Sequence, residues 1–320
     1  METAVLVYDG VFDSGLSAIL DVLDAANAMR ETLPKPPPAW KINTVGFGEQ
    51  IRTGAGHLVP VAPAAEAKRA ALLILPALAK RQPDELLDQV SGSAMTGVRQ
   101  LLADIRASDI PVASACTGTF LLAESGVLDG RRATTSWWLA PYFRTRYPAV
   151  TLDQTSMVTT SGGVTTAGAA FAHVDLALAI IRTTSPALAD LVAQYLVIDE
   201  RPSQAVYTIP SALAQSDPTI AAFELWVRTH IDEPVTITEA ARALGISERT
   251  LQRTVQRVLG TSPVRYIQDL RVERASHLLR TTDLPLEAIA RQVGYEHANT
   301  LRVLLRRRTG HTTTALRRYR

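Results

Sequence analysis

Residues 237–253 read ITEAARALGISERTLQR, and this stretch decides the fold of the C-terminal part of the chain. Apolar Ala240 and Leu244 recur at helical spacing, which predicts a short helix with one buried side. Gly245 tolerates the positive φ of a sharp turn, and the Ser247 hydroxyl can accept a hydrogen bond at the start of a second helix. The pattern therefore predicts a helix, a turn and a helix.

A second copy of the pattern begins at Leu286 and reads LEAIARQVGYEHANTLR, ending at Arg302. Gly294 occupies the turn position that Gly245 has in the first copy. Between the copies, residues 263–281 begin with a proline and predict one connecting helix. Two copies on a rigid connector can present their second helices to successive major grooves of DNA, about 34 Å apart.

The outward side of each second helix carries side chains that can hydrogen-bond to DNA. Arginine suits guanine, and glutamine or asparagine suits adenine, because each can form a bidentate pair with that base in the major groove. We expect DNA contacts from the following residues: Arg249, Thr250, Gln252, Arg253, Gln256, His297, Asn299, Arg302 and Arg306. The alternative is a helical bundle whose basic surface is merely solvated.

Charge divides the chain near residue 235. Residues 1–234 hold 17 Lys or Arg and 24 Asp or Glu, a balance of −7. Residues 235–320 hold 16 cationic side chains, all of them arginine, and 7 acidic ones, a balance of +9. A basic unit joined to an acidic one predicts that the C-terminal part binds a polyanion such as double-stranded DNA.

Short apolar runs alternate with helical patterns in the N-terminal part. Runs of buried-strand character lie at residues 4–8, 40–47, 71–75, 110–115 and 157–160. Helical patterns lie at residues 15–30, 94–107 and 166–183. This alternation predicts an α/β domain of flavodoxin-like type, with a mostly parallel sheet and helices on both faces, followed by an all-α double helix-turn-helix domain.

A polar segment with Pro202 and Pro210 separates the two patterns. We therefore predict an α/β domain over residues 1–198, a linker over residues 199–216 and a DNA-binding domain over residues 217–320.

Composition excludes several other classes. One cysteine in 320 residues excludes an intramolecular disulfide and a zinc site built on several thiolates, and it fits a reducing cytoplasm. The opening METAVLVYDG lacks a basic segment and a long apolar segment, so we expect no signal peptide. No uncharged apolar run reaches about 18 residues, so we expect no membrane span. We expect no metal and no cofactor.

Cys116 follows the apolar run 110–115 and precedes a helical pattern. A small nucleophile on a strand-to-helix turn is the arrangement of a nucleophile elbow. Catalysis also needs a base within hydrogen-bond reach, and no motif marks His57 or His173 as one. A lone cysteine beside apolar residues is also commonly a small hydrophobic side chain.

Residues 237–320 resemble the AraC-family DNA-binding domain. The matching phrases are SERTLQR at 247–253, LGTSPVRY at 259–266 and IARQVGY at 289–295. The resemblance implies sequence-specific DNA binding by both copies, although Val303 stands where many members have a basic residue.

Residues 3–198 resemble the ThiJ/PfpI class of glutamine-amidotransferase-like domains, which precede the DNA-binding domain in many AraC-family regulators. The matching phrases are YDGVFD at 8–13, VASACTG at 112–118, LDGRRATT at 128–135 and HVDLAL at 173–178. Ser136 stands where relatives often have a histidine before tryptophan, and Ala77 and Leu78 replace an expected pair of glycines. These departures favour a ligand-sensing pocket over an active site, so we expect no catalytic residue.

The two resemblances together imply a transcriptional regulator whose N-terminal domain senses a small metabolite and controls DNA binding or activation. We expect the effector near these residues: Asp13, Cys116, Thr117, Ser136 and Trp137. Trp137 can offer a cation–π face or can serve as core packing. The resemblance implies an amino acid, an amine or a related nitrogen compound as effector, and a homodimer formed through the N-terminal domain. The alternative is a cysteine-dependent hydrolase or amidase of the ThiJ/PfpI type tethered to a DNA-binding domain.

Overall fold

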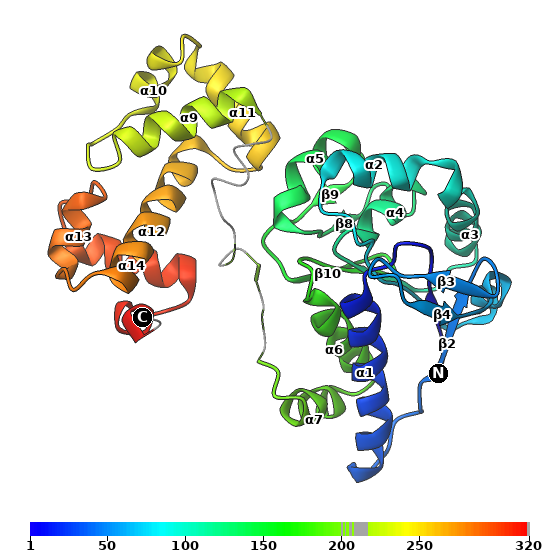
Figure 1. The fold of residues 1–320 in the computed structure, drawn as a ribbon. Coiled ribbons are helices and arrows are strands. Elements are labelled where there is room, and N and C mark those ends of the chain that lie inside the picture. Colours follow the sequence, from blue (N-terminus) through cyan, green and yellow to red (C-terminus); the bar gives the residue numbers. More distant parts are fainter. Residues whose placement is uncertain (200, 202, 205–206, 208–216, 319–320) are drawn as a thin grey trace. The chain divides into compact units, whose positions relative to one another are not determined.

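The computed structural model describes residues 1–199, 201, 203–204, 207 and 217–318, and the chain divides into two compact units, residues 1–204 and 205–320 (Figure 1). Most of the predicted linker, residues 199–216, lies outside the described residues, and its boundaries stay a prediction. Among the residues that are described, no helix is both long enough and apolar enough to cross a membrane.

A seven-stranded sheet forms the middle layer of the first unit. Its order is β10-β11-β7-β6-β1-β2-β5, and every neighbouring pair is parallel except β10 with β11. The mostly parallel sheet predicted from the apolar runs is therefore confirmed. The sheet strands are β1 (Glu2–Leu6), β2 (Lys41–Gly46), β5 (Ala62–Pro63), β6 (Leu72–Leu75), β7 (Val112–Ala115), β10 (Val158–Ser161) and β11 (Val164–Ala167). Two small pairs accompany it: β3 (Gln50–Arg52) with β4 (Leu58–Pro60), and β8 (Arg132–Ala133) with β9 (Thr151–Leu152).

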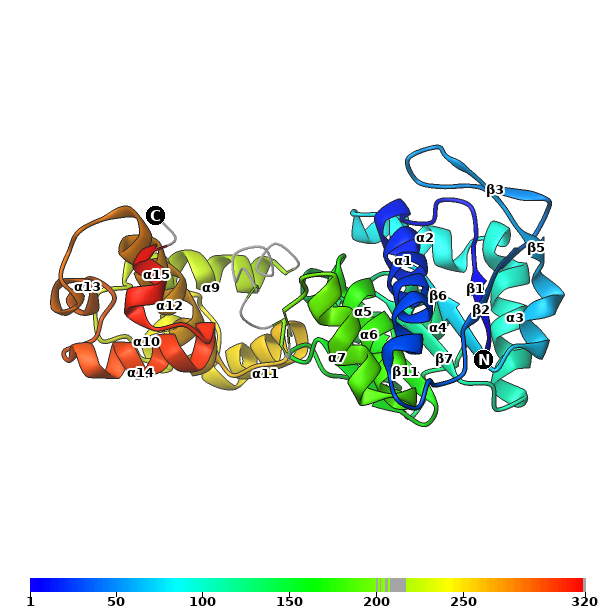
Figure 2. The same ribbon diagram turned by 90° about the horizontal axis from the view of Figure 1, so that it is seen from below.

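Helices cover both faces of this sheet. Helices α1, α6 and α7 pack together on one face, whereas α3 and α4 lie on the other (Figure 2). The helices are α1 (Asp13–Met29), α2 (Pro83–Ser91), α3 (Thr96–Ala107), α4 (Gly118–Glu124), α5 (Ala140–Arg146), α6 (Ala172–Thr184) and α7 (Pro186–Tyr195).

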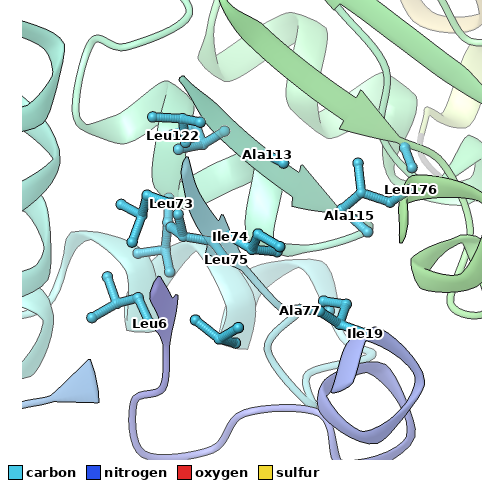
Figure 3. Close-up of a cluster of buried hydrophobic side chains, with 14 of the residues drawn as sticks. Leu6, Ile19, Leu73, Ile74, Leu75, Ala77, Ala113, Ala115, Leu122 and Leu176 are labelled. Carbon is cyan, nitrogen blue, oxygen red and sulfur yellow. The ribbon is translucent and has the colours of Figure 1, made fainter. Parts of the chain in front are cut away.

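Strand β6 lies at the centre of the core. Leu73, Ile74 and Leu75 have no exposed surface. Figure 3 shows Leu73 near Leu122 of α4, and Ile19 of α1 near Ala77. A strand that is covered on both faces needs apolar side chains at every position, which is why its sequence is an unbroken run instead of an alternating pattern. Each such side chain contributes roughly 1.5–3 kcal/mol by leaving water.

The predicted helix over residues 166–183 is wrong at its start. Residues Val164–Ala167 form β11, and α6 begins only at Ala172. Gly162 and Gly163 have positive φ angles of 54° and 77°, and they turn the chain into a hairpin with β10. The β-branched residues after that turn then pair with β7, so strand pairing overrides the helical pattern of the alanines.

The second unit consists of helices. They are α9 (Pro218–Thr229), α10 (Ile237–Ala243), α11 (Glu248–Leu259), α12 (Pro263–Thr281), α13 (Leu286–Gln292), α14 (Ala298–Thr309) and α15 (Thr313–Arg318). The two predicted helix-turn-helix copies are confirmed as α10–α11 and α13–α14, and the predicted connecting helix is α12. Hydrogen bonds at the helix starts explain where these helices begin. The Thr236 hydroxyl accepts from the Glu239 amide in a capping box at α10, and the Ser247 hydroxyl accepts from the Thr250 amide at α11.

Arg271 links α12 to the segment before the first copy and to the turn of the second copy. Its side chain projects from α12 and is only 8% exposed. The guanidinium donates to the carbonyl of Glu233 before α10 and to the carbonyl of Gly294 in the second turn. It also stacks 5.2 Å from the centre of the Tyr295 ring. A Cβ on residue 294 would lie 2.4 Å from this guanidinium, so the turn requires glycine for close approach as well as for its positive φ.

His173 has a similar role in the first unit. Its imidazole has no exposed surface, and its Nε2 accepts from the Ala77 amide at 3.0 Å. Its Nδ1–H donates to the Ala170 carbonyl at 2.7 Å, which fixes the neutral tautomer. Helix α1 approaches the ring through Gly15, where a Cβ would lie 2.6 Å from Nε2. Burial lowers the pKa of His173 to about 4.

This low pKa predicts a pH-dependent stability. The unfolded chain takes up a proton at His173 near pH 6.5 and the folded chain only near pH 4, so stability is full above pH 6.5 and falls as the pH drops toward 4. Between pH 7 and pH 5 the loss from this residue is on the order of 2 kcal/mol. Urea unfolding at both pH values measures it, and His173→Gln should remove that part of the pH dependence. An equal pH dependence in the two proteins would contradict this assignment.

For Arg271 we predict that Arg271→Ala lowers the stability of the second unit by about 2–3 kcal/mol, because two buried carbonyls lose their donor. Hydrogen exchange of the α13 and α14 amides in the full chain measures the loss. Arg274→Ala is the matched control, since Arg274 is exposed on the same helix and should cost less than about 0.5 kcal/mol. Equal protection in both variants would show that α12 holds the copies without Arg271.

Candidate functional site

The parallel strands β1, β6 and β7 end at one edge of the sheet, and their following loops meet there. The Phe12 amide donates to the Ala77 carbonyl at 2.7 Å, and the Ala79 amide donates to the Gly10 carbonyl at 2.7 Å. The turn after β7 adds Cys116, whose amide donates to the Ala167 carbonyl of β11 at 2.8 Å. Open α/β sheets bind their ligands at this carboxyl edge.

Cys116 is held in the strained backbone of an elbow. Its φ of 56° lies in the left-handed region, which a residue other than glycine rarely adopts. The side chain is 4% exposed, and its Sγ lies 2.9 Å from the Ser136 Oγ in a hydrogen bond. Burial raises the pKa of the Cys116 thiol, although hydrogen bonds from Ser136 and Thr117 partly oppose the rise. The sulfur is therefore a neutral thiol at pH 7.

Three of the predicted effector residues come together here: Cys116, Thr117 and Ser136. The Thr117 hydroxyl donates to the Leu78 carbonyl at 2.8 Å, and Ser136 has no exposed surface. The Thr135 hydroxyl, which the sequence did not single out, donates to the Cys116 carbonyl at 2.7 Å. The segment around Ser136 thus lies directly over the elbow.

Trp137 follows Ser136 and is half-buried. Its ring packs edge-on against Trp138, with ring centres 5.6 Å apart. The sequence left open whether Trp137 packs against other side chains or binds a ligand. The contact with Trp138 is of the packing kind.

Asp13, the remaining predicted effector residue, begins α1 and makes its hydrogen bonds to the β3–β4 hairpin. Its carboxylate accepts from the Ala55 amide at 2.9 Å and pairs with His57 Nδ1 at 2.8 Å. Partial burial acts to raise its pKa, but hydrogen bonds from Thr53 and His57 outweigh that effect and lower the pKa. Asp13 therefore fastens the hairpin to the start of α1.

Neither histidine considered as a base makes its hydrogen bonds to the thiol. His57 pairs with Asp13, and both nitrogens of His173 are engaged by backbone groups. The Ala77 amide donates to His173, so it is not free to stabilise an oxyanion. Within the described part of the chain, the sulfur bonds to Ser136 and Thr117 and to neither histidine, which suits ligand contact better than thiol activation.

Gln204 belongs to the site although no sequence pattern pointed to it. Its side chain has no exposed surface, and its Oε1 accepts from the Trp137 amide at 3.1 Å. A single glutamine in a polar segment carries no signal for such burial. Only the folded chain brings residue 204 beside residue 137.

In the second unit, α11 presents a polar stripe to solvent. Its exposed members are Arg249, Gln252, Arg253 and Gln256. This spacing places them on one face of the helix. Thr250 differs, because it is half-buried and its hydroxyl bonds to the Ser247 hydroxyl at 2.8 Å. Arg257, on the flank, pairs with Asp217 at 3.1 Å.

Helix α14 repeats the stripe. His297 at its start and Asn299, Arg302 and Arg306 within it are all exposed. Arg302 donates to Asn299 Oδ1 at 3.4 Å. Val303, on the same face, is 60% exposed, which is unusual for a valine. All of the predicted DNA-contacting residues except Thr250 are therefore exposed.

Comparison with known proteins agrees with both halves of the chain. The sequence profile of the DJ-1/PfpI family matches residues 1–183, and that of a helix-turn-helix domain matches residues 240–319. The HTH-type transcriptional regulator CdhR of Pseudomonas aeruginosa is 31% identical over 184 residues, which cover 56% of this chain and 54% of CdhR. The HTH-type transcriptional regulator ArgR of the same organism is 27% identical over 212 residues, covering 65% of this chain and 64% of ArgR.

The chain thus spans little more than half of CdhR and under two thirds of ArgR. Among solved structures, an AraC family transcriptional regulator from Pseudomonas putida has a similar fold, with a TM-score of 0.51 and 18% identity over 61% of this chain and 98% of that one. The chain belongs to the DJ-1/PfpI family and carries an AraC-type helix-turn-helix domain over residues 240–319.

Proposed function

We propose that the protein is a sequence-specific DNA-binding transcriptional regulator whose N-terminal unit senses a small molecule. The observation that carries this proposal is the pair of exposed polar stripes on α11 and α14. Curated relatives named as transcriptional regulators support it.

The two stripes differ at one position that faces outward. Ser247 and His297 occupy the N-cap positions of α11 and α14. Six residues after each of them stand Arg253 in α11 and Val303 in α14, so these two residues correspond. Arginine pairs with guanine, whereas an apolar side chain contacts the methyl group of thymine. We infer that the first copy favours guanine and the second favours thymine, so the two half-sites differ in sequence.

The sensing role rests on the carboxyl edge of the sheet. Cys116, Thr117 and Ser136 form a buried polar cluster there, and the thiol has a hydroxyl partner instead of a base. We propose that the effector binds at this edge, that it is an amino acid, an amine or a related nitrogen compound, and that the protein acts as a homodimer through its N-terminal unit. The neutral thiol disfavours the alternative of a cysteine-dependent hydrolase or amidase.

The proposal is tested by titrating the full chain with labelled duplexes at several salt concentrations. We expect log affinity to fall linearly with log salt, because phosphate contacts by arginine release counterions. We also expect a duplex selected from a random pool to bind more tightly than an unselected one. Binding that is absent, or equal for both duplexes, would contradict the proposal.

Arg253→Ala should cost about 1–3 kcal/mol on the selected duplex and relax the preference at a single base pair, since a bidentate guanine contact is lost. Competition among duplexes with single base changes measures this. The control is Arg242→Ala, on the first helix of the same copy, where loss should be uniform over all sequences because that helix crosses the backbone. A uniform loss for Arg253→Ala as well would assign Arg253 to phosphate.

Cys116 should react with iodoacetamide at pH 7.5 at least about tenfold more slowly in the folded chain than in urea, because the thiol is buried and its pKa is raised. Mass spectrometry of the single cysteine measures both rates. A folded-state rate that exceeds the unfolded one would reveal an activated thiolate and favour the hydrolase alternative.

A further inference from the structure

The chain leaves the first unit through a fully buried glutamine. Gln204 is the last residue of that unit, and its carboxamide has no exposed surface. A buried amide is costly unless every polar atom finds a partner, so burial at the end of a domain calls for a specific pocket. Glutamine is usually an exposed residue.

The pocket around this carboxamide matches it atom by atom. The Trp137 amide donates to Oε1 at 3.1 Å. Nε2 donates to the Thr134 hydroxyl at 3.0 Å and to the Thr135 carbonyl at 2.9 Å. Nε2 also donates to the Ser156 carbonyl at 3.4 Å, so one donor and three acceptors surround this primary carboxamide. A carboxylate in the same place would face the Thr135 carbonyl with no hydrogen to offer, and an ammonium group could not accept from Trp137.

Gly168 forms the side of the pocket opposite these groups, and only a glycine leaves room for the carboxamide there. A Cβ on residue 168 would lie 2.4 Å from the Gln204 Nε2. The amide of Gly168 is itself fixed, since it donates to the Met157 carbonyl at 2.8 Å. The backbone at this wall of the pocket is therefore held by a bond that does not involve Gln204.

The same pocket adjoins the candidate effector site. Thr135 and Trp137, which hold the carboxamide, flank Ser136, and Ser136 bonds to the Cys116 sulfur. The neighbouring backbone is also held: the Gln204 amide and the Ser203 hydroxyl both donate to the Thr155 carbonyl, at 2.9 and 2.7 Å, and Ser203 forms an antiparallel bridge with Ser156. Any molecule that occupies the pocket must displace Gln204.

We propose that this pocket is a carboxamide-binding subsite, that Gln204 fills it as an internal ligand, and that an effector bearing a primary carboxamide displaces it. Displacement removes the side-chain hydrogen bonds that hold Gln204, the last residue of the first unit. The inference rests on the proposed sensing function and names the chemical class of its ligand. A tethered ligand competes at an effective concentration in the millimolar range, so an effector must bind more tightly than the glutamine alone.

Chemical rescue of the full-length variant Gln204→Ala tests the subsite. Acetamide reproduces the glutamine side chain beyond Cβ, which the alanine variant keeps, and acetate is its matched control. We expect acetamide to raise the Tm of Gln204→Ala in a saturable way, with an affinity at least about tenfold greater than for the wild-type chain, because ligand that binds only the folded state stabilises it. Acetate should leave the Tm unchanged. No shift with acetamide, or equal shifts with both compounds, would overturn the carboxamide assignment.

Hydrogen exchange tests the release. The backbone amide of residue 204 should exchange at least about tenfold faster in Gln204→Glu than in wild type, because the carboxylate cannot donate to the Thr135 carbonyl. This variant keeps the size of the side chain, so it serves also where Gln204→Ala does not fold. Unchanged exchange would show that the bonds to the Thr155 carbonyl are enough to hold residues 203–204, and it would contradict the proposed release. Neither experiment contains DNA, so failure here is separate from failure of the proposed regulator function.

Discussion

The parallel pairing of β1, β6 and β7 is the constraint on which the N-terminal site depends. Leu73 pairs with Val112, and Ala4 pairs with Leu73, so the three strands end at the same edge. The loops after these strands are thus held against one another, and the same pairing places Cys116 at this edge, where its sulfur bonds to Ser136.

The second unit obeys a comparable constraint with different chemistry. A buried arginine there supplements an apolar core that includes Leu278, Ile289 and Leu301. Arg271 is useful for this purpose because its planar fork can donate to two carbonyls that lie far apart in sequence. These bonds hold the turn before α14 against α12, the helix that joins the two copies.

Much of this could be predicted from the sequence. Helical spacing, turn glycines and capping residues are local signals, so both helix-turn-helix copies and the exposed side of each second helix followed from them. The start of α6 could not be predicted, since pairing with β7 decides that Thr166 and Ala167 extend instead of coiling. Thr250 was expected at the DNA, yet its hydroxyl is engaged by Ser247. The burial of Gln204 could not be predicted, because its hydrogen-bond partners lie about seventy residues earlier in the sequence and only the folded chain brings them together.

The central claim is that two matched helices read DNA sequence together. Selection of bound duplexes from a random pool by the full-length protein tests it most directly. The account predicts an enriched motif with two conserved segments whose centres lie about 10 base pairs apart, one helical turn of DNA. Enrichment of guanine in one segment and thymine in the other would match Arg253 and Val303. A pool that stays random after repeated selection, or a motif with a single conserved segment, would contradict the account.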